Sequence, residues 1–419
     1  MRRLRRGGCL LLVLSAAWLP ACAPAGKKPE TLEIVFWQSR PIAVVAPLVA
    51  GFERAHPGLR VRVERIAEPC GQERIRAALA TGAGPDLCEI RSTGMPALLA
   101  GGLLVDWSAG VADLRPVLRG WELCSVGDAL YGVPWVLETR VLFYDRALFA
   151  RARLDSTRAP ETWDQLLRAA AAIQRLGHGV HGYGVPAPER GVLARQVLPL
   201  LYANGGRILS DDLRHAVFDS SANVAALDFL LSLRRFGTMG RQESLEREFA
   251  QGRLGLLLAG AGLVGRIAKH APGLRYGVAL VPRPASAPGP GVSWAGGRLL
   301  VSFNAAKHRH EALELARFLV EPANALALSD AVGDAGPATV GADTSAAYAA
   351  RPVEATFARQ LATVRFAPNH PVWEAMEAAI EDEVEEALFD RKSAARAVQD
   401  AQATLAELVG KHRVPEVAR

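Results

Sequence analysis

Two charged side chains interrupt an apolar stretch between Tyr131 and Phe149. The runs GVPWVL and VLFYD are typical of buried strands, and between them stand Glu138, Thr139 and Arg140. A continuous core strand does not carry an unpaired carboxylate and guanidinium at its middle, because burying such charges is very costly. Either the chain reaches the surface here, with Glu138 and Arg140 paired on a rim, or it crosses a cleft and presents these groups to a ligand.

Further polar and aromatic side chains stand where expected strands end. In open α/β folds, ligands bind in the crevice beyond the carboxyl ends of parallel strands. Two strands are expected over residues 31–39 and 85–90, and the candidates at their ends are Trp37, Gln38, Arg40, Arg91 and Ser92. We expect these side chains to contact a ligand, with ordinary packing as the alternative for each.

One glycine spacing is typical of nucleotide sites. Gly260, Gly262 and Gly265 form G-x-G-x-x-G after an apolar run, but a dinucleotide fingerprint also needs an acidic residue about 20 positions further on. No Asp or Glu occurs between Glu248 and Glu311. We therefore expect no nucleotide at this turn, and no other cofactor.

Histidine pairs and an acidic run suggest two more kinds of chemistry. The histidines of GHGVHG and KHRH stand in polar turns without a carboxylate or cysteine close by, so we expect no metal site. Asp382 and Glu386 are adjacent on an expected helix, a spacing that is common on solvated helix faces. An exported enzyme that hydrolyses a carbohydrate through these two carboxylates is the enzymatic alternative, although we expect no enzyme.

The N-terminus is typical of an export signal. MRRLRRGG is positively charged, CLLLVLSAAWL is apolar but too short to span a bilayer, and LPAC follows. LPAC resembles the bacterial lipobox, in which the cysteine is lipidated and becomes the new N-terminus. We expect a signal peptide over residues 1–21, lipidation at Cys22 and a tether over residues 22–31; an ordinary cleavage site and an uncleaved anchor are the alternatives. Four arginines of the signal contribute to the net charge of +6, so we expect no surface for nucleic acid.

The composition indicates a globular chain. Half of the 419 residues are hydrophobic and 22% are charged, and this length suggests roughly two to three domains. Once Cys9 leaves with the signal and Cys22 is acylated, Cys70, Cys88 and Cys124 remain in an oxidising compartment. One disulfide and one free thiol are then possible, in any of the three pairings, and the spacing matches no zinc motif.

Strands alternate with helices over the first quarter of the chain, which predicts an α/β lobe with a largely parallel sheet. Strands are expected there over residues 31–39, 61–66 and 85–90, with helices over residues 47–59 and 73–84 and a helix followed by a turn over residues 95–107. After residue 144 the expected helices are longer and cover residues 162–177, 222–237, 310–320, 371–389 and 393–410. Further strands are expected over residues 253–260, 274–282 and 296–304.

The order of these pieces resembles one known family, the extracellular solute-binding proteins of the carbohydrate, maltose-binding-like type, which are the receptors of ABC importers. The matching pieces begin with FWQS, GFERAHPG, ALATGAGPDL and AGGLLVDW. They continue with ALYGVPWVLETRVLFYDRALF, PETWDQLL, YANGGRILS, RLGLLLAG, YGVALVPRP, WAGGRLLVS and HEALELARFLVEP. Each is short and degenerate, and their number and order over nearly the whole mature chain carry the resemblance.

The resemblance implies a two-lobed α/β fold with a ligand cleft between the lobes and several hinge crossings. Residues 32–139 with 298–340 would form the N-terminal lobe, and residues 140–297 with 341–419 would form the C-terminal lobe. The segment ETRVLFYD would be the first crossing between them. Each lobe would be discontinuous, because the chain passes between them more than once.

The resemblance also implies where a sugar would bind. Glu138 stands six residues before Tyr144, as does a carboxylate that contacts sugar hydroxyls in maltose-type receptors. The paired Gly296 and Gly297 would lie at the cleft, where glycines allow a close approach to the backbone. Further candidates are Tyr183, Trp294, Arg298, Arg365 and Trp373. Gly262 stands where family members often place an aromatic residue, which suggests a smaller or differently shaped ligand.

We therefore expect a lipid-anchored receptor, periplasmic or on the cell surface, that binds a sugar or related polyol and delivers it to the permease of an ABC importer. Planar polar groups would bind the hydroxyls, and tryptophan rings would stack on the apolar faces. We expect a monomer whose partners are the solute, the permease subunits and, through the lipid, the membrane. A receptor for an anionic solute, favoured if the arginines converge in the cleft, and a sensor in place of the permease are the alternatives.

Overall fold

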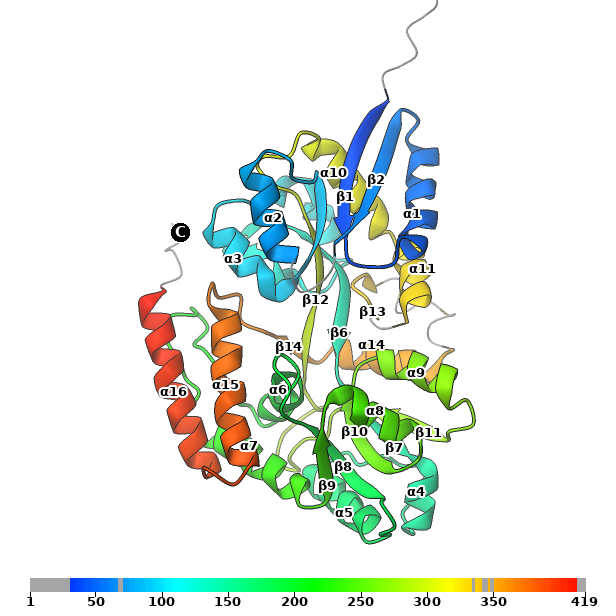
Figure 1. Ribbon diagram of the computed structural model, residues 1–419, viewed down its shortest axis with the longest axis vertical. Helices are drawn as coiled ribbons and strands as arrows, with labels where there is room; N and C mark the ends of the chain where they lie inside the picture. The colour runs from blue at the N-terminus through cyan, green and yellow to red at the C-terminus, as the bar shows by residue number, and fades with distance from the viewer. Residues whose placement is uncertain (1–30, 67–70, 334–335, 341–345, 347–349, 413–419) are drawn as a thin grey trace, which may run out of the picture.

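The computed structural model describes residues 31–66, 71–333, 336–340, 346 and 350–412. Two lobes are stacked along the long axis. The strand β6 (Val133–Thr139) runs from the upper lobe toward the lower one, and the antiparallel β12 (Ser293–Val301) runs back into the upper lobe (Figure 1). The predicted two-lobed α/β fold is thus confirmed. The signal peptide, Cys22 and Cys70 lie outside the described residues.

In the described part of the chain, the upper sheet has seven strands in the order β13-β6-β12-β3-β1-β2, with β14 beside β12. Its other strands are β1 (Leu32–Gln38), β2 (Leu59–Arg65), β3 (Leu87–Arg91), β13 (Gly336–Pro337) and β14 (Val364–Phe366). β1 is parallel to β2 and β3, whereas β12 is antiparallel to β3 and β6. The carboxyl end of β1 therefore points toward the lower lobe (Figure 1), and so does that of the parallel β3.

Helices cover both faces of the upper sheet because its side chains alternate in direction. Phe36, Leu87 and Leu300 share one core with α1 (Ile42–Ala55), α10 (Arg309–Leu319) and α11 (Pro322–Val332). Cys88 follows Leu87 and Leu299 precedes Leu300, so both point to the other face of the sheet. There they share a second core with α2 (Gly71–Ala80) and α3 (Met95–Ala100). A short hairpin of β4 (Ser125–Val126) and β5 (Ala129–Leu130) precedes β6.

The lower sheet has five strands in the described residues, in the order β11-β7-β10-β8-β9. These are β7 (Val141–Asp145), β8 (His181–Pro186), β9 (Gly237–Gly240), β10 (Leu254–Ala259) and β11 (Tyr276–Ala279). β10 is parallel to β8 and antiparallel to β7. The carboxyl end of β10 and the start of β7 therefore lie together, at the edge of this sheet that faces the crossing strands.

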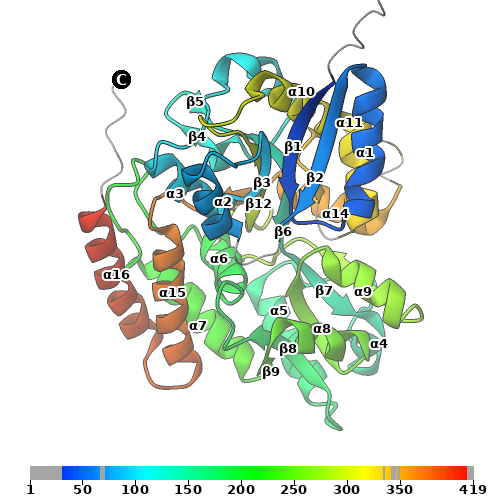
Figure 2. The same cartoon turned by 45° about the horizontal axis from the view of Figure 1, so that its top comes forward.

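The helices of the lower lobe surround this sheet. They are α4 (Arg146–Arg151), α5 (Trp163–Gln174), α6 (Ala194–Ala203), α7 (Ser221–Arg234), α8 (Gln242–Ala250) and α9 (Gly262–His270). α15 (Trp373–Leu388) and α16 (Ala394–Lys411) pack on each other and on α7 along one side of the lobe (Figures 1 and 2). Hydroxyl caps begin α5 and α16, where Thr162 and Ser393 accept hydrogen bonds from backbone N–H groups.

Hydrogen bonds join two crossings at the hinge. The first crossing is the single step from β6 to β7 at Arg140, and the second is the segment that leads from β11 into β12. The Thr139 hydroxyl donates to the Trp294 carbonyl (2.7 Å), and the Ser293 hydroxyl donates to the Arg140 carbonyl (2.9 Å). These buried bonds hold the two segments side by side between the sheets. α14 (Pro352–Leu361) packs beside the same strands before the chain returns through β14.

The lobe limits predicted at residues 139/140 and 297/298 fall between β6 and β7 and inside β12, respectively. All of β12 pairs within the upper sheet, while α15 and α16 lie beside the lower sheet. The limits themselves stay a prediction. No helix of the described residues is both long and apolar enough to span a membrane.

The start of the first helix was predicted wrongly. The pattern placed the first helix from Pro47, but α1 begins at Ile42 and contains Pro47. A proline within a helix removes one backbone hydrogen bond. The burial of Val45, Leu48 and Phe52 in the upper core offsets that loss.

Candidate functional site

Polar groups gather where β6 and β12 leave the upper sheet. Glu138 lies opposite Gly296 in the antiparallel pair of these strands. A Cβ atom on Gly296 would lie 2.7 Å from the Trp294 ring, and one on Gly297 would lie 2.3 Å from the Val136 carbonyl oxygen. The glycine pair therefore keeps the two backbones close and places no side chain opposite Glu138.

A buried carboxylate organises the upper wall of the site. Glu89, on β3, accepts hydrogen bonds from the backbone N–H (2.7 Å) and hydroxyl (3.0 Å) of Ser39 through one oxygen. Arg40 Nε lies 3.7 Å and Arg298 Nη1 lies 3.9 Å from the other oxygen. Glu89 thus holds two guanidinium groups at the carboxyl ends of the upper strands, on the side that faces the lower lobe.

Arg195 brings a charge from the lower lobe to the same place. It lies in the first turn of α6, a helix that is otherwise mostly apolar. Arg195 Nη1 is 3.7 Å from Glu138 Oε2, and its guanidinium lies 5.5 Å from the centre of the Trp294 ring. An ion pair and a cation–π contact therefore join α6 to both crossing strands.

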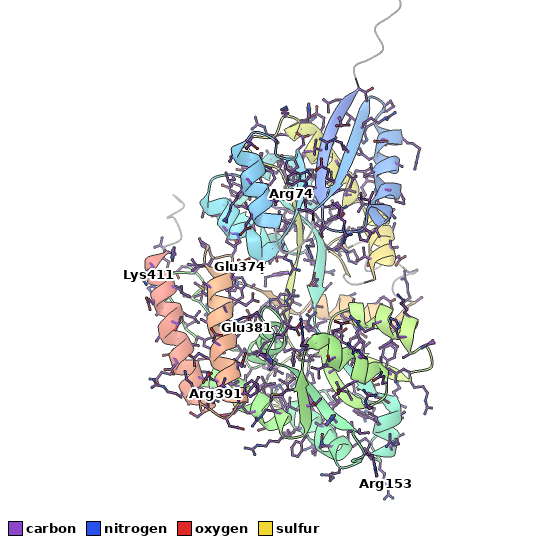
Figure 3. The ribbon with its side chains drawn as sticks, viewed as in Figure 1. Arg74, Arg153, Glu374, Glu381, Arg391 and Lys411 are labelled. Carbon is purple, nitrogen blue, oxygen red and sulfur yellow. The ribbon has the colours of Figure 1, made fainter. Side chains whose placement is uncertain are left out.

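The start of α6 is held in position by a carboxylate of α15. The two oxygens of Glu381 accept hydrogen bonds from the backbone N–H groups of Gly191 and Ala194, each at 2.9 Å. Figure 3 shows Glu381 on α15 beside α6. A negative charge is favourable at a helix N-terminus, so this contact fixes the turn that carries Arg195.

Arg140 lies at the hinge and is only 9% exposed. Gly260, at the end of β10, makes room for it, since a Cβ atom there would lie 2.5 Å from Arg140 Nη1. Burial and the nearby Arg195 lower the pKa of Arg140 to about 10, while Glu138 and Glu246 act in the opposite direction. Among the described residues, the Nε atom of Arg140 has no hydrogen-bond partner.

A chain of polar contacts connects α6 to α8 below Arg140. Gln196 Nε2 donates to the Leu258 carbonyl and to Gln242 Oε1 (3.2 Å). Gln242 Nε2 donates to Glu246 Oε1, and Arg266 Nε donates to Glu246 Oε2, both at 2.9 Å. Arg266 therefore balances the charge of Glu246, and the network fixes the floor of the site.

Arginines of both lobes act on Glu138. Burial raises the pKa of Glu138, but four guanidinium groups together outweigh burial and hold this pKa below its usual value. In order of effect, they belong to Arg195, Arg298, Arg140 and Arg91. Arg91 and Arg298 come from the upper sheet, Arg140 from the hinge and Arg195 from the lower lobe, so the site is built from both sides.

Glu377, on α15, experiences the opposite shift. Burial, and then the nearby Glu381, raise the pKa of Glu377 to about 7, although Arg195 and Arg91 act against this rise. Arg195 and Arg91 thus influence both Glu138 and Glu377. Both carboxylates therefore lie within electrostatic range of the same two arginines.

The arrangement of the chain matches a known protein family. The model of the bacterial extracellular solute-binding proteins matches residues 47–356. The chain belongs to this family. A lipoprotein of Streptomyces antibioticus, described as uncharacterised and in the oleD 5′ region, is 26% identical over 351 residues, covering 78% of this chain and 73% of that protein. The sn-glycerol-3-phosphate-binding periplasmic protein UgpB of Pectobacterium atrosepticum is 24% identical over 330 residues, 73% of each chain.

Solved structures of sugar-binding proteins share the fold. The sugar-binding protein MalE of Xanthomonas citri superposes with a TM-score of 0.82 and 26% identity, covering 90% of this chain and 98% of that one. The predicted resemblance to the maltose-binding-like receptors of ABC importers is thereby confirmed. By their names, UgpB and MalE are binding proteins. In this solute-binding protein, Asp382 and Glu386, weighed above as catalytic acids, form exposed ion pairs with Arg190 and Arg391.

Many predicted contacts lie together at the crossing of the lobes. They are Arg40, Arg91, Ser92, Glu138, Trp294, Gly296, Gly297 and Arg298. The Ser92 hydroxyl accepts a hydrogen bond from the Gly297 N–H (3.2 Å), which ties β3 to the glycine pair. Gln38 is next to this group, and its amide bonds the backbone N–H and carbonyl of Arg40. Solute contact by each residue stays a prediction.

The other candidates lie apart from this group. Trp37 packs on the opposite face of the upper sheet, with the Arg74 guanidinium 4.6 Å from the centre of its ring. Tyr183 and Trp373 are each 1% exposed in the core of the lower lobe. Arg365 donates to the Gly206 carbonyl (3.3 Å) and lies over the Tyr202 ring. Their roles as ligand contacts remain predictions.

Sequence reasoning missed four members of the site. Arg140 was noted beside Glu138 but was not named among the candidate contacts, and Glu89, Arg195 and Glu377 were not singled out. Two of them carried a signal: Glu89 is a charge within the apolar run DLCEI, and Arg195 opens the apolar run VLPLLY. Glu377 stands among many acidic residues of EAMEAAIEDEVEE, where only packing distinguishes a cleft carboxylate from a solvated one.

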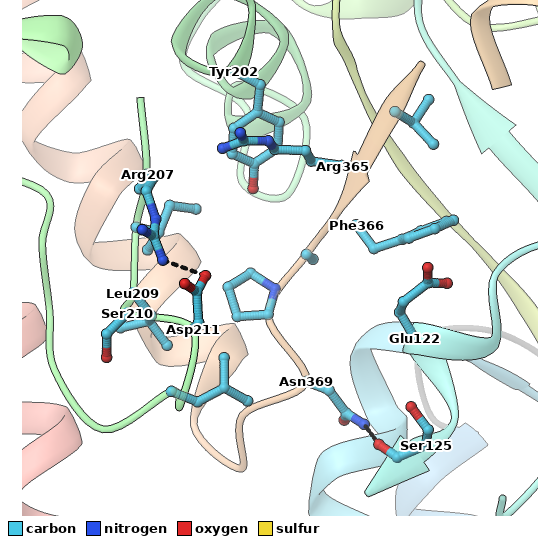
Figure 4. Close-up of a pocket in the computed structure, with 15 residues that line it drawn as sticks. Glu122, Ser125, Tyr202, Arg207, Leu209, Ser210, Asp211, Arg365, Phe366 and Asn369 are labelled. Atoms are coloured by element: carbon cyan, nitrogen blue, oxygen red, sulfur yellow. Dashed lines mark hydrogen bonds and ion pairs between the residues drawn. The ribbon is translucent and has the colours of Figure 1, made fainter. Parts of the chain in front are cut away.

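A separate cavity of about 660 Å³ also lies between the lobes. Figure 4 shows it between the loop of Arg207 and Asp211, the strand β14 with Phe366, and the region of Glu122 and Ser125. Phe366 packs with the core on the face of the upper sheet opposite Glu89 and Arg298. Arg207 and Asp211 pair with each other there. Arg365 lines this cavity, but the arginines around Glu138 do not.

Two rival chemistries find no support at their expected positions. Gly260 of the G-x-G-x-x-G spacing makes room for the Arg140 side chain, as described above. The need for glycine at this position therefore does not require a bound nucleotide. Within the described ranges, no three His, Cys, Asp or Glu residues are grouped to hold a metal ion. Cys88 and Cys124 are buried free thiols, so the pairing between them is not formed.

Proposed function

We propose that this protein is the lipid-anchored receptor of an ABC importer and that it captures a carbohydrate or related polyol between its lobes. The observation that carries the proposal is the convergence of Glu138, Trp294, Arg298 and Arg195 at the crossing of the lobes. Carboxylate and guanidinium groups bind hydroxyls in fixed directions. The family membership supports capture of a solute, and the named relatives support this solute class.

Export and anchoring are the second part of the proposal. The pattern LPAC places Cys22 at the end of an apolar signal, and a relative is named a lipoprotein. A lipid on Cys22 holds the receptor at the membrane, beside the permease that accepts the solute. Replacement of Cys22 by Ala should release the protein from the membrane fraction, as measured by fractionation of the producing cells. Retention of the variant in the membrane fraction would refute lipid anchoring.

Solute capture is tested by thermal unfolding of the mature chain from Ala23 onward. A solute that binds only the folded state raises the unfolding midpoint. The panel contains mono- and disaccharides, polyols, polyol phosphates, amino acids and polyamines. A rise with sugars or polyols, charged or neutral, supports the proposal, whereas a rise only with amino acids or polyamines contradicts it. Gel filtration with light scattering tests the proposed monomer.

A further inference from the structure

We propose that the cavity of about 660 Å³ beside β14 is a second binding site, separate from the group around Glu138, and that it takes a neutral hydroxylated molecule, a sugar or a polyol. The inference goes beyond the proposed function, because it concerns another place in the molecule and needs no solute at Glu138. It rests on how both lobes enclose the cavity, on a buried hydroxyl in its wall and on the charges that line it.

Both lobes contribute walls to the cavity. From the upper lobe come Glu122, Ser125 and the strand β14, and from the lower lobe come Tyr202 of α6 and the loop of residues 207–213 (Figure 4). Pockets for small molecules usually have volumes of about 300–1,000 Å³. A cavity of about 660 Å³ is therefore large enough for a monosaccharide or a small polyol.

Two hydrogen bonds hold these walls in place. Arg365, on β14 of the upper sheet, donates to the Gly206 carbonyl of the lower lobe (3.3 Å). Asn369, in the segment that leads from β14 to α15, donates through Nδ2 to the Ser125 carbonyl (2.9 Å), as Figure 4 shows. The shape of the cavity is thus set by contacts between segments that are distant in sequence.

Tyr202 provides a polar group that the protein itself does not use. Its side chain is only 5% exposed, and burial raises the pKa of its hydroxyl. Among the residues that the structure describes, this hydroxyl has no hydrogen-bond partner. Figure 4 shows it directed into the space between Asp211 and Phe366. Buried hydroxyl groups in proteins are usually hydrogen-bonded, and a ligand hydroxyl in the cavity would satisfy this one.

The charged side chains that line the cavity balance one another. The cations are Arg207 and Arg365, and the anions are Asp211 and Glu122. Arg207 and Asp211 form an ion pair. Glu377, on α15, also acts on Tyr202, in the direction opposite to that of Arg365. An ion of either sign therefore gains little net attraction here.

A neutral hydroxylated molecule matches this lining. Guanidinium groups donate hydrogen bonds and carboxylates accept them, and a hydroxyl does both, so it can use the two kinds of group. The guanidinium of Arg365 lies 5.9 Å from the centre of the Tyr202 ring, which places two polar groups together. Leu209 and Phe366 add apolar surface beside them. Sugars and polyols combine hydroxyls with C–H groups and therefore fit such a mixed wall.

Occupation of the cavity would act on both lobes. A molecule in contact with Tyr202 and with β14 favours the arrangement in which these two walls have their present separation. The site would therefore stabilise this arrangement from the face of the upper sheet opposite Glu89, without contact with Glu138.

The test measures the binding of probes to the mature protein and its variants by calorimetry. The neutral probes are glucose, maltose, glycerol and myo-inositol, and glucuronate and glucosamine are the charged counterparts of glucose. We expect at least one neutral probe to lose affinity by about three- to tenfold in Tyr202→Phe, the effect of one hydrogen bond. Arg365→Gln should weaken the same probe. Tighter binding of glucuronate or glucosamine than of glucose through Tyr202 would overturn the choice of a neutral molecule.

A matched control assigns the effect to the cavity. Tyr276→Phe removes a hydroxyl from β11, outside this cavity, and should bind the probe like the wild type. The side chain of Arg365 is exposed, so Arg365→Gln remains a usable variant if Tyr202→Phe does not fold. The inference is overturned if no neutral probe binds, or if neither cavity variant weakens any of them.

Glu138→Gln separates this site from the site of the proposed function. A probe that loses affinity in Tyr202→Phe but not in Glu138→Gln binds in the cavity. If every neutral probe shows the reverse pattern, the inference fails and the proposed function stands. If neutral probes bind only through Tyr202, the cavity site is supported and the proposed capture at Glu138 is contradicted.

Discussion

At the scale of single residues, buried charges decide what the site can do. Glu89 and Arg140 are almost completely buried, a position that is costly for a charge unless other groups compensate it. The charge of Glu89 is compensated by the N–H and hydroxyl of Ser39 and by two arginines. Removal of this carboxylate should therefore disturb the positions of all these groups. Glu377 is the member of the group whose charge changes near neutral pH.

Replacement of Glu89 by Gln should destabilise the fold strongly. The variant removes the buried carboxylate that Arg40 and Arg298 share, and breaking a buried pair in this way typically costs about 3–5 kcal/mol. Urea unfolding of the ligand-free protein measures the free energy of unfolding. Glu243→Gln is the control, since Glu243 is 68% exposed and its loss should cost less than about 1 kcal/mol. Equal effects of the two substitutions would show that Glu89 does not organise the wall.

Ionisation of Glu377 should reduce stability as the pH rises. Its pKa is about 7 in the folded protein, against an ordinary value of 4.5. A carboxyl group with a raised pKa contributes stability in full below its unfolded pKa and loses that contribution as the pH rises through the folded value. Relative to Glu377→Gln, the wild type should lose at most about 3 kcal/mol between pH 4.5 and 7.5. Parallel pH profiles of the two proteins, from unfolding experiments, would contradict the assignment.

At the scale of elements, the site depends on close contacts between segments that are distant in sequence. β6 and β12 approach closely because Gly296 and Gly297 have no side chains. α6 presents Arg195 because Glu381 of α15 fixes its first turn. The hinge bonds of Thr139 complete this frame. No single element determines where the charged side chains lie. The contacts between these elements do.

Gly297→Ala should disturb the pairing of β6 with β12. The added methyl group would lie 2.3 Å from the Val136 carbonyl oxygen, so the strands must separate. We expect a loss of about 1–3 kcal/mol in the free energy of unfolding, together with weaker solute binding.

Gly265→Ala is the matched control for this substitution. Nothing lies within 4 Å of the corresponding Cβ position on α9. Alanine is favoured over glycine in a helix by about 1 kcal/mol, so this variant should be neutral or more stable. If Gly297→Ala were as stable as Gly265→Ala, the close approach of β6 and β12 would be unimportant.

At the scale of the whole molecule, we expect solute binding and lobe movement to be coupled. The site takes groups from both lobes, and the lobes are linked by narrow crossings, one of them the single step at Arg140. A hinge of this kind allows rigid lobes to rotate with little change in their cores.

Solute binding should make the molecule more compact. A ligand that contacts both lobes stabilises the closed arrangement, so the radius of gyration from small-angle X-ray scattering should fall when the best solute is added. Arg195→Gln at the same solute concentration is the control, because it removes a contact from the lower lobe. An unchanged radius in a wild-type protein saturated with solute would show that binding and closure are independent.

Local patterns were sufficient for the fold and for part of the site. Apolar periodicity and turn residues predicted the alternating strands and helices, and the charges between GVPWVL and VLFYD indicated the crossing at Glu138. The helix start at Ile42 was missed, because burial of its apolar face outweighs the local preference of Pro47. Strand ends also indicated Arg40 and Arg91, because the position of a side chain beyond a strand follows from chain order, whereas Arg298 was indicated by the family resemblance.

Only the tertiary structure decided which charges meet. Arg195 and Glu377 stand in helices far along the chain, and no local pattern relates them to Glu138. The tertiary structure also decided the position of Trp37, whose side chain lies on the opposite face of the sheet from that of its neighbour Gln38. Electrostatic interaction depends on distance and burial, and both are set by how the two lobes pack. The meeting of these charges at the hinge is therefore a property of the folded molecule.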